Sequence, residues 1–266
     1  MFTAELTFEC YQDSTIDAVN DGITQLVDAL RYNGQILGRE FPTSMHEGVF
    51  VTRVVCPEED SLQHSNHSEQ VKTQLHALAD AGLLQPKIRI TGMDLHSDNT
   101  DPCESRNWQI LYTHYLSTCS PLRCGEHLAP IPLYKVPTIS GGDHQALLRW
   151  QVDWSCADEL QMHGTTLAEP CRSTLTNWLS PLNQTGAQLA QDIEQHSNIP
   201  TYYYLYHIGN ETIEGGEEYG DGGELDAQAK ARRCPSCQGD WLLEEPIQGI
   251  FDFKCDNCRI VSNLPW

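Results

Sequence analysis

The chain has 266 residues, 39% of them apolar, which is enough for two or three domains with packed cores of ordinary size. Its formal net charge of −21 weighs against tight, non-specific nucleic-acid binding by the whole chain, because such binding requires a basic surface. The sequence contains neither an apolar run of about 18 residues nor a signal-peptide start, so we expect a cytoplasmic protein without membrane segments.

Residues 1–95 alternate between strand-like and helix-like patterns. In chain order these are strand, helix, strand, helix and strand, at 2–10, 15–32, 48–56, 68–84 and 87–95. If 39–45 forms a further strand, the order becomes βαββαβ, which predicts a ferredoxin-like sandwich. We therefore expect an α+β protein with this domain at its N-terminus.

Residues 96–209 are expected to form a mixed domain of short strands and a helical hairpin. The expected elements are a strand, a stretch of short or edge strands with four prolines, two helices and a final aromatic strand, at 108–116, 120–137, 143–162, 167–196 and 199–208. The second helix is expected to be interrupted near Pro181.

Residues 210–231 are rich in acids and glycines, which indicates a flexible, disordered linker. The linker separates the mixed domain from a C-terminal segment, 232–266.

Two Cys-x2-Cys pairs mark this C-terminal segment. Cys234 and Cys237 form the first pair, Cys255 and Cys258 the second, and 17 residues lie between the pairs. This spacing is typical of a zinc ribbon, in which two tight turns present four thiolates to one structural Zn²⁺. The intervening residues 241–243 and 250–253 are strand-like and could form the connecting hairpin. The alternative is a redox pair or free buried cysteines.

The ribbon also carries candidate contact residues for nucleic acid or for a partner protein. They are four bases and three aromatic residues: Arg232, Arg233, Lys254, Arg259, Trp241, Phe251 and Phe253. Aromatic side chains of this kind can stack on bases. They can equally form the small core of the ribbon or dock on a protein, and five acids in the same segment outnumber the bases.

A second metal site is a further hypothesis. Asp101-x-Cys103 and Cys124-x2-His127 together offer carboxylate, thiolate and imidazole groups, all of which bind zinc. Cys119 is a rival ligand. The alternative is a buried cysteine with a surface histidine in a loop.

Long segments of the chain resemble a bacterial family of uncharacterised function, described as zinc-ribbon-containing and as candidate nucleic-acid-binding proteins. They are ALRYNGQILGREFP (29–42), VVCPEEDSL (54–62), SPLRCG (120–125), IPLYKVP (131–137), LQMHG (160–164), IPTYYYLY (199–206) and EEPIQGIFDFKCDNCRIVSNLPW (244–266). The resemblance implies a zinc ribbon on the four C-terminal cysteines. It also implies a second site, because related chains carry Cys-x-Cys near 101–103 and Cys-x2-Cys near 124–127. This chain departs from that pattern at Asp101 and His127.

These observations lead to three hypotheses for function. The first is a non-enzymatic zinc-ribbon protein that contacts nucleic acid or a nucleic-acid-associated machine. The second is an acidic adaptor that docks on a basic protein through the ribbon. The third is a metalloenzyme using the region from Asp101 to His127. Asp153, Trp154, Cys156 and Asp158 also lie together on an expected helix, but no pair of base and nucleophile can be recognised among them.

Overall fold

The secondary structure of the chain is of the α+β type, with two sheets. The computed structural model describes residues 1–103, 105–139, 142–208 and 230–264. The expected linker lies outside the described residues, apart from 230 and 231. The chain divides into two compact units, the first made of Met1–Glu104, Ser117–Cys124 and Ala129–Leu148, and the second of Ser105–Leu116, Gly125–Leu128 and Arg149–Trp266. Among the described residues, every helix is too short or too polar to cross a membrane.

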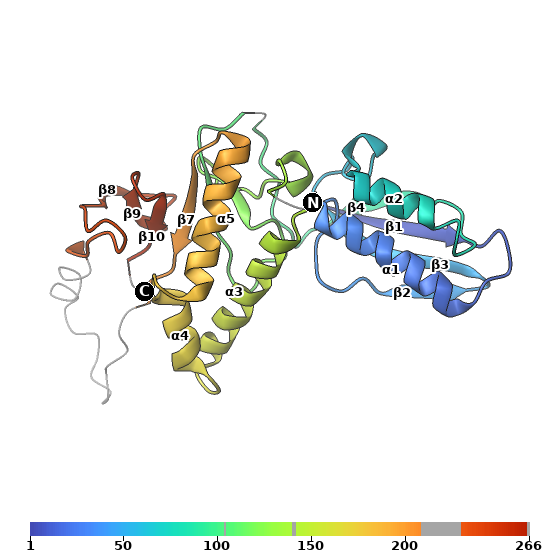
Figure 1. Cartoon of the computed structure of the whole chain (residues 1–266), viewed down its shortest axis with the longest axis horizontal. Coiled ribbons are helices and arrows are strands. Elements are labelled where there is room, and N and C mark those ends of the chain that lie inside the picture. Colours follow the sequence, from blue (N-terminus) through green and yellow to red (C-terminus); the bar gives the residue numbers. More distant parts are fainter. Residues whose placement is uncertain (104, 140–141, 209–229, 265–266) are drawn as a thin grey trace. The chain divides into compact units, whose positions relative to one another are not determined.

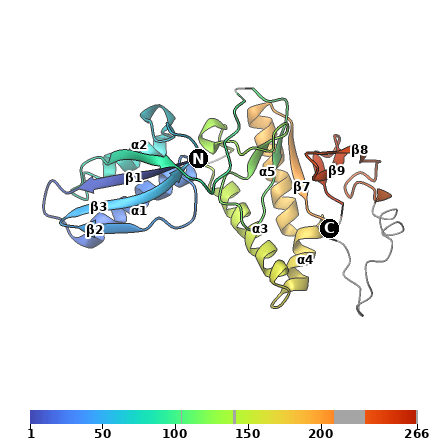
Figure 2. The ribbon, with the colours of Figure 1, turned by 180° about the vertical axis from the view of Figure 1, so that it is seen from behind.

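The first unit contains a four-stranded antiparallel sheet in the order β2-β3-β1-β4. Its elements are β1 (Phe2–Glu9), α1 (Ile16–Tyr32), β2 (Thr43–His46), β3 (Val49–Cys56), η1 (His64–Asn66), α2 (Glu69–Ala77), β4 (Lys87–Met93), β6 (Leu122–Cys124) and η2 (Leu133–Lys135). From β1 to β4 the order of strands and helices is the βαββαβ order that the sequence predicts. Figures 1 and 2 show α1 and α2 together on one face of this sheet.

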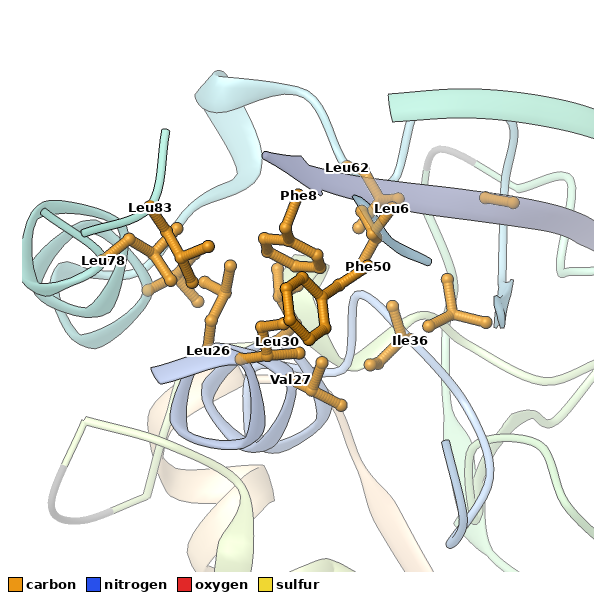
Figure 3. Packing of buried hydrophobic residues seen from close by; sticks show 14 of the residues in the cluster. Leu6, Phe8, Leu26, Val27, Leu30, Ile36, Phe50, Leu62, Leu78 and Leu83 are labelled. Carbon is orange, nitrogen blue, oxygen red and sulfur yellow. The ribbon is translucent and has the colours of Figure 1, made fainter. Parts of the chain in front are cut away.

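Apolar side chains from the sheet and from both helices form one core in the first unit. Leu6 and Phe8 of β1 point toward Leu26 and Leu30 of α1 (Figure 3), and all four side chains are at most 3% exposed. Alternation along the strand and helical spacing along α1 place these residues on facing sides. The sequence periodicity therefore locates this core correctly.

Helix α2 ends earlier than the expected 68–84. Its regular hydrogen bonding stops at Ala77, and the chain continues in tight turns, in which the amides of Ala79 and Ala81 donate to carbonyls three residues back. Gly82 closes these turns with φ +74°, a conformation that glycine adopts without strain. The apolar stripe continues past the helix because the turns also face the core.

The second unit contains neighbouring strands in the order β5-β7-β10-β9-β8. Its elements are β5 (Gln109–Leu111), α3 (Gln145–His163, which begins in the first unit), α4 (Ala168–Thr176), α5 (Pro181–Ser197), β7 (Thr201–Leu205), β8 (Leu242–Ile247), β9 (Phe251–Cys255) and β10 (Ile260–Ser262). Pro181 begins α5 instead of interrupting a longer helix, because proline fits the first turn and Ser180 caps it.

Strand β7 lies between β5 and β10 and runs parallel to both. Strand β5 is shorter than the expected 108–116, and its pairing with β7 covers Gln109 to Leu111. Strand β10 in turn pairs antiparallel with β9. The C-terminal hairpin therefore joins the sheet of the second unit through β10. Figure 1 shows β10 beside β7.

Candidate metal centre

The four C-terminal cysteines come together at two turns. Cys234 and Cys237 lie in the turn before β8, Cys255 ends β9, and Cys258 lies in the turn before β10. Their Sγ atoms all lie within 4.8 Å of one another, and those of Cys237 and Cys255 are 3.6 Å apart. A tetrahedral ion with metal–sulfur bonds of about 2.3 Å separates its sulfurs by about 3.8 Å. The four thiols could therefore hold one metal ion.

The backbone of both turns is shaped in the same way. The residue directly after the second cysteine is left-handed in each turn, with φ 59° at Gln238 and 54° at Arg259. In the first turn, the amide of Gln238 donates to the carbonyl of Cys234 at 2.9 Å, and the amide of Cys234 donates to that of Gly239 at 3.0 Å. These bonds close the first turn, in which Cys234 and Cys237 present their sulfurs to the cluster.

Burial and hydrogen bonding act in opposite directions on the thiols. Burial raises the pKa of Cys255 to about 12 and raises that of Cys234. A hydrogen bond from the amide of Gly239 lowers the pKa of the exposed Cys237 to about 7. A cation bound among the four sulfurs would stabilise all of them as thiolates.

Trp241 and Phe253 form a small core in the segment, and Phe251 packs against Tyr112 and Tyr204 of the same unit. Trp241, Phe251 and Phe253 are at most 3% exposed, and the rings of Trp241 and Phe253 lie 5.0 Å apart. The guanidinium of Arg232 lies 4.6 Å from the centre of the Phe253 ring and donates to Ser262 Oγ at 2.8 Å. The buried aromatic faces are thus packed against protein, which was the alternative to base stacking.

The other three bases of the segment also have partners in the second unit. Arg233 pairs with Asp240, and Lys254 Nζ lies 3.1 Å from an Asp256 carboxylate oxygen. Arg259 Nε lies 3.0 Å from a carboxylate oxygen of Glu194 in α5.

Three family models match successive parts of the chain. They are described as "Domain of unknown function (DUF8589)" over residues 1–92, "Domain of unknown function (DUF2310)" over 103–206 and "Domain of unknown function (DUF8594)" over 223–266. An "Uncharacterized protein" of Haemophilus influenzae (strain ATCC 51907 / DSM 11121 / KW20 / Rd) is 39% identical over 258 residues, covering 96% of this chain and 94% of that protein. The chain belongs to the family of this Haemophilus protein.

Two more proteins show similarity to this chain. A second "Uncharacterized protein" of the same strain is 40% identical over 185 residues, covering 70% of this chain and 85% of its own. A crystal structure of a candidate antibiotic biosynthesis monooxygenase from Deinococcus radiodurans matches with a TM-score of 0.27 and 13% identity, covering 38% of this chain and 100% of that one. In this chain, the four clustered cysteines all lie in residues 223–266, the segment that the third family model matches.

Only some residues of the hypothetical second site lie close together within one unit. In the first unit, a carboxylate oxygen of Asp101 and Sγ of Cys124 lie within 4.8 Å of each other, and both residues are buried. The amide of Cys103 donates to Asp101 Oδ1 at 3.3 Å, but its sulfur is not part of this cluster. Cys119 Sγ accepts a hydrogen bond from Arg123 at 2.9 Å. His127 is counted with the second unit, so the complete ligand set stays a prediction.

The sequence reasoning missed the residues that support the second cysteine turn. Tyr202 donates its hydroxyl to Asp256 Oδ1 at 2.5 Å, inside the Cys255–Cys258 turn, and Glu194 holds Arg259 directly after it. These contacts join residues 54 and 65 positions apart, so no local spacing could have revealed them. Gly125 lies in the turn that follows Cys124, and the Trp108 ring also requires a glycine there, because a Cβ would lie 2.2 Å from that ring.

Proposed function

We propose that the four clustered cysteines bind one structural Zn²⁺ and that residues 232–266 are a zinc ribbon. The observation that carries this proposal is the approach of four sulfurs to within 4.8 Å of one another at the ends of two similar turns. An all-sulfur tetrahedral set suits zinc better than magnesium or calcium, which prefer oxygen ligands.

The proposed role of the ion is structural, and the proposed protein is a binding protein, not an enzyme. Four thiolates close the coordination shell and leave no position for water or substrate. The ion would hold β8 and β9 against β10, and through β10 against β7. A small hairpin of this kind has little core of its own, so metal binding would supply much of its folding free energy.

For the partner, we favour a protein over direct contact with nucleic acid. The net charge of −21 opposes approach to phosphates, and the aromatic side chains of the ribbon are buried. Its four bases already contact acids or rings of the same unit. A basic protein partner is therefore the preferred proposal, and contact with nucleic acid or with a nucleic-acid-associated machine is the second.

Metal content of the purified full chain tests the zinc assignment. We expect about one zinc ion per chain at the ribbon and about two if the Asp101–Cys124 region also binds one, measured by mass spectrometry of the metal. Cys237→Ser should remove about one ion per chain. The exposed Cys156→Ser is the matched control and should remove none. Equal zinc content in both variants would exclude the ribbon site. Point variants are preferable to deletion of 232–266, because deletion also removes β10 from the sheet.

Retention on immobilised DNA and RNA at low salt tests the choice of partner. We expect none. Salt-sensitive retention that is lost when Arg233 and Lys254 are changed to Gln would support the nucleic-acid proposal instead.

A further inference from the structure

The second unit contains a cavity of about 320 Å³ whose lining does not include the four clustered cysteines. Five aromatic side chains and one carboxyl group dominate its lining: Tyr112, Tyr115, Trp154, Tyr204, Tyr206 and Asp158. Every lining residue belongs to the second unit. The volume is at the lower end of the range for small-molecule sites.

Helix α3 supplies one wall of this cavity. Trp154, Asp158 and Met162 follow one another at intervals of four residues, so they lie along one face of the helix. Trp154 is 2% exposed and Met162 is 56% exposed, so this row runs from the protein interior to the surface. Asp158 lies between them and places a carboxyl group on an otherwise apolar row.

The ends of two parallel strands supply the opposite wall. Tyr112 directly follows β5, Tyr204 lies in β7, and Tyr206 directly follows β7. Strands β5 and β7 pair in parallel, so both end on the same side of the sheet. In open sheets with parallel strands, ligands bind at these carboxyl ends.

Four of the rings that line the cavity follow one another in a series. Ring centres lie 5.9 Å apart from Trp154 to Tyr206, 6.2 Å from Tyr206 to Tyr204 and 5.0 Å from Tyr204 to Tyr112. Successive planes are inclined by 46° to 54°, so the rings form a curved lining and not a flat stack. An aromatic lining of this kind attracts a cation through the negative faces of its rings.

Asp158 is 4% exposed, which is unusual for a carboxyl group in an aromatic surrounding. Its Oδ2 accepts a hydrogen bond from the amide of Tyr115 at 2.9 Å, and its Oδ1 accepts one from Gln161 at 3.2 Å. Burial raises its pKa, and the hydrogen bonds from Tyr115 and Gln161 oppose this effect. A cation in the cavity would stabilise the carboxylate further.

We propose that this cavity binds an organic ammonium group, such as a methylated amine, with the rings against its methyl groups and Asp158 as its counter-charge. Such an ammonium group could belong to a free small molecule or to a methylated lysine side chain of a protein. Inorganic cations do not fit, because they require several oxygen ligands and the lining is mainly aromatic. This proposal does not rest on the zinc assignment, although Ile250 of the proposed ribbon lines the cavity.

Calorimetric titration of the full chain with choline chloride tests the proposal. We expect saturable binding about tenfold tighter than that of 3,3-dimethylbutan-1-ol, the neutral molecule of the same shape. A peptide with trimethyllysine and its unmodified counterpart form the second arm. Tighter binding of the trimethyllysine peptide than of choline would identify a protein source, and the reverse a small molecule. Absence of saturable binding in both arms, or equal binding of choline and the neutral alcohol, would overturn the proposal.

Two variants assign binding to this cavity. Asp158→Asn keeps an oxygen that can accept from Tyr115 but removes the charge, and should weaken choline binding about tenfold. Asp153→Asn, exposed on the same helix, is the matched control and should bind like the parent chain. Tyr206→Leu removes one ring but keeps an apolar side chain, and should also weaken binding. Thermal unfolding of each variant verifies that it is folded. Folded Asp158→Asn and Tyr206→Leu variants with unchanged affinity would contradict the assignment.

Discussion

At the scale of single residues, the buried Asn183 links three segments of the second unit. Its side-chain amide donates to the carbonyl oxygens of Leu175 at 3.0 Å and Asn177 at 2.7 Å, where α4 ends. Its Oδ1 accepts from the hydroxyl of Tyr203 in β7 at 2.6 Å. The carbonyl groups at the end of a helix otherwise lack partners, so this one side chain satisfies two of them inside the protein.

We therefore predict that Asn183→Ala destabilises the protein by about 3 kcal/mol, because it leaves several buried polar groups without partners. Tyr203→Phe removes only one of these bonds and should cost about 1 kcal/mol. Urea unfolding followed by tryptophan fluorescence measures both. Thr185→Ala, on the exposed side of α5, should stay within about 0.5 kcal/mol of the parent chain. A cost for Asn183→Ala no larger than that control would contradict the role assigned to this residue.

A second residue, His207, makes stability depend on pH. Burial, reinforced by the nearby Arg232 cation, lowers its pKa to about 4 from an unfolded value near 6.5. The unfolded chain then binds this proton more tightly than the folded chain does. The contribution of His207 to stability is complete above pH 6.5 and is lost as the pH falls toward 4.

The variant His207→Asn, which carries no titrating group there, should lose less stability between pH 6.5 and 4 than the parent chain. Thermal unfolding at stepped pH values measures the difference. His163→Gln, at an exposed position of α3, is the control and should follow the parent curve. Coinciding curves for His207→Asn and the parent would exclude this contribution.

At the scale of elements, the position of β10 connects the proposed zinc site to the sheet. Strand β10 pairs with β9 on one side and with β7 on the other. Cys255 and Cys258 lie in the turn that leads into this strand, so loss of the proposed ion would release that turn.

We predict that a zinc chelator increases amide hydrogen exchange in β8, β9 and β10, and to a smaller extent in β7. Exchange in β1 and α1 of the first unit should not change, because their core is built without the ribbon. Hydrogen exchange read by mass spectrometry gives all of these regions in one experiment. Equal protection of β9 with and without the chelator would show that the hairpin folds without metal.

At the scale of the whole molecule, acids outnumber bases by 37 to 16. Mutual repulsion of so many like charges lowers the stability of the folded chain, and dissolved salt screens it. The exposed ion pairs of the first unit, such as Arg53 with Glu5, contribute little to the stability of the folded chain. Salt that screens these pairs therefore removes little stability.

The melting temperature should accordingly rise by several degrees as sodium chloride increases from roughly 0.02 to 0.3 M, over which the screening length shortens from about 20 to 6 Å. Calorimetry measures the shift. Sucrose at matched osmolarity is the control for effects unrelated to charge. A fall in melting temperature with salt would indicate that ion pairs outweigh repulsion.

Local patterns in the sequence predict much of this architecture. Alternation in β1 and helical spacing in α1 identify a buried face from neighbouring residues alone, and the cysteine spacing identifies the cluster of four cysteines. Contacts between distant segments leave no such pattern. The pairing of β10 with β7, the support of Arg259 by Glu194 and the cavity around Asp158 all depend on residues far apart in the chain. Such features become visible only when the chain is folded.

The insertion of β10 between β7 and β9 has one more consequence. If metal starvation releases the hairpin, β7 keeps its partner β5 but exposes the peptide groups of Tyr203 to Leu205 on its other edge, in a buried strand with three consecutive tyrosines. An open strand of this composition is a template onto which another copy can add by backbone pairing. Metal supply would then decide the solubility of this protein, and aggregation would accompany zinc deficiency.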